Sequence, residues 1–330
     1  MSTPNKRFGW WRLALGIAVF AGVLAYWLPS WRDVWANVNL DPLALGLGFL
    51  ASTVSAVVTS ARWQVMVETM GGTRLPYRVY LHTFLLTKVL GQVSSTLVMD
   101  LLGRGVLLRS AGSTRGVGHT MTQAVLERIF DIVLPVLMIG WAFVYLHPDA
   151  TNTVRLSLFA GVCLVFVAVA GRSLRPLSRI ALAIYRRVRP PAPGEPGDQV
   201  PTISRSLATG VGLLSLARYL AVITQFWLVA TAVGIDLPVL AMAAATPIAQ
   251  LASAVGITPG ALGIQEAGWA GALQWVGAPA AVIALFILSQ RVIISSYFLL
   301  LALVTRPFVP VPSVPNELDS PSEKFASTNK

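Results

Sequence analysis

The sequence predicts an all-α polytopic membrane protein with about six full transmembrane helices and two broken or re-entrant elements. Of the 330 residues, 55% are hydrophobic and only 12% are charged, whereas soluble domains carry about 25% charged residues. Several apolar runs approach or exceed the roughly 20 residues that a helix needs to cross a bilayer. These runs lack the alternation of apolar and polar residues that is typical of a membrane β-barrel.

The predicted full spans follow one another with polar or basic connections between them. They lie at about residues 10–28, 43–67, 120–145, 156–170, 207–233 and 281–304. The first span begins like a signal peptide, but its apolar core is long and no small-residue cleavage site follows, which favours an uncleaved helix. We expect residues 1–9 to precede one transmembrane domain at 10–305, and the Pro/Ser-rich tail at 306–330 to be disordered.

Two further apolar segments should not form straight helices. The segment 79–100 carries Lys88 and a Ser-Ser-Thr cluster at 94–96. The segment 239–276 is interrupted by four residues that bend or break helices: Thr258, Pro259, Gly260 and Gly263. Broken backbone at membrane depth is tolerated only where protein buries it or where it lines a cavity. In transporters such interrupted helices form substrate sites, so both segments are predicted to handle a polar group inside the membrane.

The distribution of Lys and Arg predicts the orientation. Most basic residues lie at the N-terminus, in the tail and in the connections at 71–78, 101–118 and 172–205. The positive-inside rule places these segments, and hence both termini, in the cytoplasm of a cell with this protein in its inner (plasma) membrane. The segment 79–100 then enters from the cytoplasm and 239–276 from outside. Such a layout is expected of inverted-topology repeats that meet near the midplane.

The net charge of +11 does not indicate nucleic-acid binding, because the basic residues lie in loops between the apolar runs. The single cysteine, Cys163, excludes an internal disulfide and a cysteine-based metal site. The histidines are far apart and show no ligand spacing. We therefore expect no metal and no other cofactor.

Ionised residues inside the spans cost about 2.5–3.5 kcal/mol each on insertion scales, and they usually face inward and pair with one another. Arginine suits a phosphate because its planar guanidinium donates two hydrogen bonds at once. The candidate headgroup-binding residues are Arg62, Arg128, Arg218 and Arg291. Three acidic residues are expected to hold or release these arginines: Glu127, Asp131 and Glu266.

Structural explanations stay open for the same residues. Glu127 and Asp131 share a helix face, and Arg128 can reach Asp131 at i,i+3, so the group could be a neutralised strut. Arg62 could extend to the lipid headgroups. Glu266 follows the second break, where the positive end of a half-helix would favour a carboxylate.

Two motifs resemble those of the lysylphosphatidylglycerol synthase transmembrane family. The stretch from Thr258 to Gly268 resembles its TPGGLGxxE signature, and the stretch from Ala124 to Asp131 resembles its xxxERxxD helix. The Arg62-Trp63 pair resembles the Arg-Trp near the end of its second span. The resemblance covers about residues 10–305. Where the family has a Gly-Gly-Asp/Glu followed by Arg, this sequence offers Asp100 and Arg104 at longer spacing, as a further ion pair.

The resemblance implies translocation, or flipping, of an anionic lipid or a polyprenyl-phosphate-linked glycolipid, with no enzyme activity. Some members of the family carry a fused aminoacyl-transferase domain, and here only a short tail follows the last span. Two other functions stay open. An intramembrane transferase acting on a lipid phosphate would need an acidic pair or a base in a sizeable loop. A non-transporting scaffold of a cell-envelope lipid pathway could use the basic segment 172–205.

Overall fold

The computed structural model describes residue 22 and residues 40–70, 72–113, 117–188, 204–256 and 258–306. These residues are almost entirely helical, and five of their helices are long and apolar enough to cross a membrane. The predicted class of polytopic all-α membrane protein is thereby confirmed. The predicted first span at 10–28 and most of the tail lie outside the described residues.

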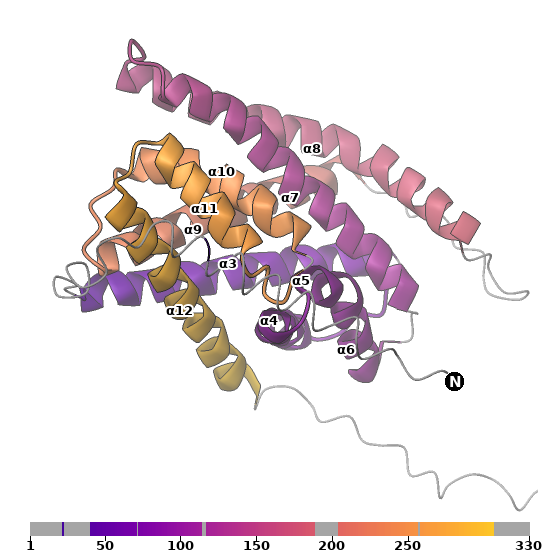
Figure 1. Cartoon of the computed structure of the whole chain (residues 1–330). Coiled ribbons are helices and arrows are strands. Elements are labelled where there is room, and N and C mark those ends of the chain that lie inside the picture. Colours follow the sequence, from indigo (N-terminus) through magenta and orange to yellow (C-terminus); the bar gives the residue numbers. More distant parts are fainter. Residues whose placement is uncertain are drawn as a thin grey trace, which may run out of the picture.

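The five long helices correspond to the remaining predicted spans (Figure 1). They are α3 (Pro42–Thr69), α7 (Val117–Tyr145), α8 (Asn152–Val188), α9 (Arg205–Ala232) and α12 (Ala280–Thr305). Only α8 departs clearly from its predicted bounds, because it continues from the expected end near residue 170 into the basic segment 172–205. Its 37 residues span roughly 55 Å at 1.5 Å per residue. That length exceeds the ~30 Å hydrocarbon core.

Helices α3 and α9 form a closely packed antiparallel pair at the centre of the molecule. The Asp41 N–H at the start of α3 donates to the Ala232 carbonyl at the end of α9, at 2.9 Å. Further along, Arg62 of α3 donates to the hydroxyl of Ser215, in the first half of α9. Small residues buried on α3 permit this close approach. Helices α7 and α8 form an antiparallel hairpin along one edge (Figure 1).

The first broken element is a helical hairpin. Helix α4 (Tyr77–Val93) ends at Ser94, whose backbone is extended. The chain turns back through α5 (Thr96–Val98), a π-helical turn η1 (Met99–Gly103) and α6 (Arg104–Ser110). Leu108 of α6 packs with Val79 and Tyr80 at the start of α4, so the hairpin opens beside the C-terminal end of α3.

The second broken element is also a hairpin, built from α10 (Val239–Val255) and α11 (Ile264–Trp275). Gly260 and Gly263 have φ angles of 58° and 83° between the two helices, a region that glycine adopts without a steric penalty. Gly268 of α11 lies directly against Ala249 and Ala252 of α10. The chain therefore turns back on itself, and the hairpin opens beside the C-terminal end of α9, where Val233 and Ile235 join its core.

The tips of the two hairpins meet. The Gly260 N–H donates to the carbonyls of Gly91 at 2.7 Å and Ser94 at 2.9 Å, and the Ser95 hydroxyl donates to the Gly256 carbonyl at 3.0 Å. Because α3 and α9 are antiparallel, the hairpins enter from opposite ends of that pair. This geometry is the predicted layout, while the membrane face that each hairpin enters from stays a prediction.

Candidate functional site

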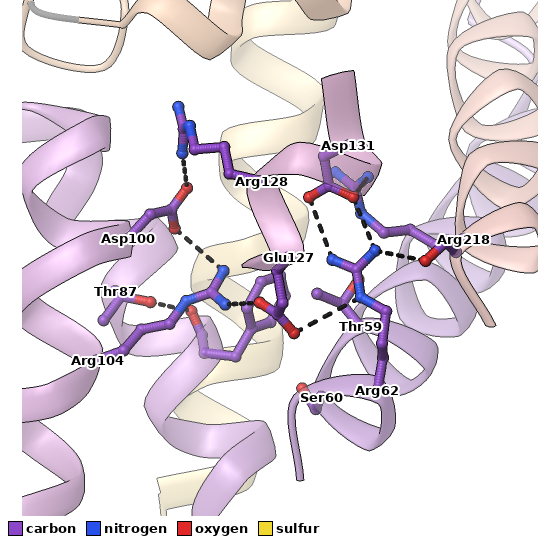
Figure 2. A network of polar contacts seen from close by, with 12 residues as sticks. Thr59, Ser60, Arg62, Thr87, Asp100, Arg104, Glu127, Arg128, Asp131 and Arg218 are labelled. Carbon is purple, nitrogen blue, oxygen red and sulfur yellow. Dashed lines mark hydrogen bonds and ion pairs between the residues drawn. The ribbon is translucent and has the colours of Figure 1, made fainter. Parts of the chain in front are cut away.

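A cavity of about 210 Å³ lies beside the meeting tips. It is lined from both hairpins and from the long helices α3, α7, α9 and α12. Its charged lining residues are Lys88, Asp100, Arg104, Arg128, Asp131 and Arg218. The remaining lining is a mixture of uncharged polar and apolar side chains. Figure 2 shows how most of the charged groups connect.

Arg62 lies behind the cavity wall, between Glu127 and Asp131 (Figure 2). It donates to both Asp131 oxygens, at 2.8 and 3.1 Å, and to the Ser215 hydroxyl at 2.9 Å. Its Nε is 3.6 Å from Glu127 Oε1. The side chain is 1% exposed, so the alternative in which Arg62 extends to the membrane surface is wrong. The carboxylates on α7 hold it inside, and it is not among the residues that line the cavity.

Asp100 forms the centre of the cluster on the first hairpin. It accepts from Lys88 at 3.2 Å, from Arg104 at 3.2 Å and from Arg128 at 3.1 Å. Arg104 also donates to Glu127, at 2.7 Å, which links this cluster to Arg62. The predicted ion pair between Asp100 and Arg104 is therefore present, one helical turn apart across η1 and α6.

Arg128 does not form its predicted local pair with Asp131. It turns instead toward the hairpin tips, where it donates to Asp100 and, at 2.6 Å, to the Ala254 carbonyl at the end of α10. Asp131 already accepts from Arg62 and from Arg218, the latter at 3.0 Å. The triplet on α7 thus joins α3, η1, α6, α9 and α10 rather than neutralising itself.

The cluster carries excess positive charge. Five cations (Arg62, Lys88, Arg104, Arg128 and Arg218) are joined to three carboxylates (Asp100, Glu127 and Asp131), which gives a net charge of +2. Within the described part of the chain, Arg218 donates only one side-chain hydrogen bond. Uncompensated charge away from bulk water is costly. An anion in the cavity would therefore be stabilised.

Arg291 and Glu266 support the second break. Arg291 donates to the Gly260 carbonyl at 2.8 Å, and its Nη1 is 3.3 Å from Glu266 Oε1. The other oxygen of Glu266 accepts from the Gly263 N–H at 2.6 Å, at the start of α11. Both interpretations of Glu266 are thus present together: it caps the half-helix and it pairs with an arginine. Arg291 braces the tip and does not line the cavity.

A model of the lysylphosphatidylglycerol synthase TM region matches residues 11–303. The chain belongs to this family. No curated protein and no solved structure gave a significant match. The family's Glu-Arg-Asp helix and its Thr-Pro-Gly break both lie at the cavity, although they are far apart in the sequence.

The residues of the family's broken signature have separate structural tasks here. The Thr258 hydroxyl donates to the Leu262 carbonyl at 2.9 Å and so closes the turn. Pro259 forms an isolated antiparallel bridge with Ser95 of the first hairpin. Gly260 lies too close to the Gln92 carbonyl, and to Arg291, for a larger residue to fit easily. The break is therefore the contact point between the two hairpins.

Several residues that line the cavity were not predicted as site residues, among them Lys88, Gln92 and Gln225. Lys88 interrupts the apolar segment 79–100, and its position four residues before Gln92 places both on one face of α4. Gln225 follows Arg218 by two helical turns, so these two residues also share one face of α9. Pairs of polar residues at helical spacing inside apolar runs were the available signal.

Metal ligands are not assembled anywhere in the described ranges, where no three His, Cys, Asp or Glu residues come together. Cys163 is buried in an apolar cluster with Phe166 and Trp141. The chemistry available at the cavity is therefore that of arginine, lysine and carboxamide donors held by paired carboxylates, which suits binding of an anionic group.

Proposed function

We propose that this protein moves a lipid with an anionic headgroup across the inner membrane. The substrate is an anionic phospholipid or a polyprenyl-phosphate-linked glycolipid. Its phosphate binds in the cavity and its chains stay in the bilayer. The observation that carries this proposal is the net charge of +2 around a cavity at the junction of two broken hairpins.

The incomplete pairing of the cations that face the cavity supports phosphate binding. Arg218 and Lys88 are 20% and 23% exposed in their side chains, so each can turn donors toward an occupant. A guanidinium and an ammonium together can contact several phosphate oxygens. Apolar side chains on α9 and α12, including Phe226 and Phe298, complete the lining. The site is thus amphiphilic, as a lipid headgroup with the start of its chains requires.

The proposed orientation places both termini in the cytoplasm. Arg172, Arg175 and Arg179 are exposed on the part of α8 that follows the predicted apolar run at 156–170, and basic residues beside an apolar run favour the cytoplasmic side. The first hairpin then opens to the cytoplasm and the second to the outside. Their tip contacts would have to separate for a headgroup to pass.

The protein is proposed to act without covalent chemistry. Asp100 and Asp131, the carboxylates of the cavity lining, are each held by at least two cations. A carboxylate so stabilised in its charged form is a poor general base. This arrangement favours binding over the transferase alternative.

Reconstitution in vesicles tests the proposal directly. Fluorescent phosphatidylglycerol and a labelled polyprenyl phosphate are placed in proteoliposomes, and the fraction accessible to an impermeant quencher is followed with time. We expect movement by the wild type and a loss of tenfold or more in Arg218→Gln. The matched control, Arg175→Gln on the exposed face of α8, should keep wild-type movement.

Three results would count against the proposal. Folded wild-type protein that moves no anionic lipid would overturn translocation and favour a scaffold role. Equal movement by wild type and Arg218→Gln would remove the Arg218 cavity from the mechanism. Formation of a modified lipid by purified protein supplied with a sugar donor would favour the transferase instead.

A further inference from the structure

Four glutamines line the cavity alongside the cations: Gln92, Gln225, Gln250 and Gln265. Gln225 is only 3% exposed, and the Nε2 of Gln250 is buried. In the described part of the chain, the carboxamides of Gln92, Gln225 and Gln250 have no hydrogen-bond partner. Gln265 accepts a single long contact, 3.5 Å from Arg291. A buried polar group without a partner is costly, so the unpaired carboxamides of Gln225 and Gln250 point to a ligand, whereas Gln92 is exposed.

The glutamines gather toward one end of the cavity. On α4, Gln92 lies one turn beyond Lys88, and on α9, Gln225 lies two turns beyond Arg218. Gln92 lies at the end of α4 that meets the tip of the second hairpin, where the Gly91 carbonyl accepts from the Gly260 N–H, and Gln225 is displaced from Arg218 toward the C-terminal end of α9, beside which that hairpin opens. The offset is roughly 6 Å on α4 and 10 Å on α9 at 1.5 Å per residue.

Helix α10 shows the same displacement of a glutamine from the cations. It belongs to the hairpin that opens beside the C-terminal end of α9, so it runs opposite to α9. Its Ala254 carbonyl accepts from Arg128 at 2.6 Å, and Gln250 lies one turn before that point. Gln250 is therefore displaced from the cations toward the same end as Gln225. The cavity has a cationic pole and a carboxamide pole.

The two poles differ in what they can recognise. A carboxamide donates and accepts hydrogen bonds and carries no charge, which matches the hydroxyl groups of a polyol. The cationic pole matches a phosphate. An ammonium group has no free carboxylate to pair with, because Asp100 and Asp131 are already held by cations, and the net charge of +2 repels it.

We infer that the cavity selects a phosphate ester of a neutral polyol, such as glycerol, inositol or a sugar, and disfavours headgroups that carry an amine. The lipid part of this inference rests on the proposed function. A headgroup without hydroxyls would leave the carboxamides unpaired, and sites built to bind hydroxyls reject analogues that lack them strongly.

Equilibrium binding tests the inference without requiring transport. The dissociation constants of full-length protein in neutral detergent are measured for phosphatidylglycerol and phosphatidylinositol. Phosphatidic acid, phosphatidylethanolamine and lysyl-phosphatidylglycerol are the comparison lipids. We expect the two polyol lipids to bind at least tenfold more tightly than the other three. Inositol phosphate and glycerol phosphate are added as water-soluble competitors, to separate recognition of a lipid from recognition of a solute.

Variants of the carboxamide pole complete the test. Gln225→Leu and Gln250→Leu should weaken binding of phosphatidylinositol about five- to tenfold while leaving phosphatidic acid unchanged. The control Gln274→Leu, at an exposed position of α11, should change neither. Equal affinity for all five lipids, or an equal loss for phosphatidic acid in the two pole variants, would overturn the inference.

The failures of the two proposals are distinguishable. Selective binding without lipid movement in vesicles would leave the polyol phosphate site in place and remove translocation. Movement of lipids without headgroup selectivity would keep translocation and overturn the polyol phosphate site. Tight binding of the water-soluble esters, with no advantage for the lipids, would keep the headgroup chemistry and overturn the lipid substrate.

Discussion

Two arginines on neighbouring helices share one carboxylate and differ in their other partners and in the exposure of their side chains. Arg62 of α3 contacts Asp131, Glu127 and Ser215 and is 1% exposed in its side chain. Among the described residues, Arg218 of α9 forms an ion pair only with Asp131, and its side chain is 20% exposed. The two arginines differ in how many of their N–H donors are already bound by other groups of the protein. This difference divides the charged residues into a structural rear wall behind the cavity and a front that faces the ligand.

The same division applies to the other cations. Arg291, which holds the Gly260 carbonyl and Glu266, belongs with Arg62 as a support. Lys88 and Arg128 line the cavity with Arg218. Replacing a support should therefore change stability first, and replacing a front residue should change lipid binding first.

The largest expected effect is that of Arg62→Leu. Removing one partner of a buried ion pair leaves carboxylates uncompensated and costs about 3–5 kcal/mol. We expect a strongly lowered melting temperature in detergent, or failure to accumulate folded protein. Arg175→Leu, at an exposed position of α8, is the matched control. An unchanged melting temperature in Arg62→Leu would show that the rear wall does not support the fold.

Lys88→Gln should affect binding more than stability. Asp100 keeps Arg104 and Arg128 as partners, so the fold loses little. A hydrogen bond to a charged group contributes about 1.5–3 kcal/mol, which corresponds to roughly a 10- to 100-fold weaker affinity for an anionic headgroup. Lipid binding and thermal melting are measured on the same preparation. A large drop in melting temperature with unchanged affinity would show that Lys88 supports the fold and does not bind the headgroup.

Gly260→Ala tests the contact between the hairpin tips. A Cβ there would lie 3.1 Å from the Gln92 carbonyl oxygen and 3.0 Å from Arg291 Nη2, on a backbone with φ of 58°. Strain of this kind costs about 1–3 kcal/mol. We expect a lowered melting temperature and slower lipid movement. Gly161→Ala is the control, because a Cβ at that helical position meets nothing within 4 Å, and its melting temperature should not fall.

The smallest effect is expected for Tyr219→Phe, next to Arg218 in sequence. Tyr219 is 1% exposed among apolar residues, and its buried hydroxyl has no hydrogen-bond partner in the described ranges. Removing that hydroxyl should leave stability unchanged or raise it by less than about 1 kcal/mol. Lipid binding should not change. Weaker lipid binding in this variant would show that Tyr219 also belongs to the cavity-facing side of α9.

Local chemistry made the helices and their breaks predictable. Runs of about 20 apolar residues can cross a bilayer only as helix, and Pro259 with two nearby glycines cannot continue one. The end of α8 was less predictable. Its basic residues are good helix formers, so the helix continues after the apolar run ends.

The membrane class, the five described spans, both broken hairpins and the presence of buried charge could therefore be predicted from the amino-acid pattern. Which cations support the fold and which face the cavity depends on how the helices pack. Arg62 and Arg218 are chemically identical, and their roles differ because α7 presents two carboxylates to one and a single oxygen to the other. The carboxamide pole had the same origin, since Gln92, Gln225 and Gln250 come together only when three helices pack around the hairpin tips.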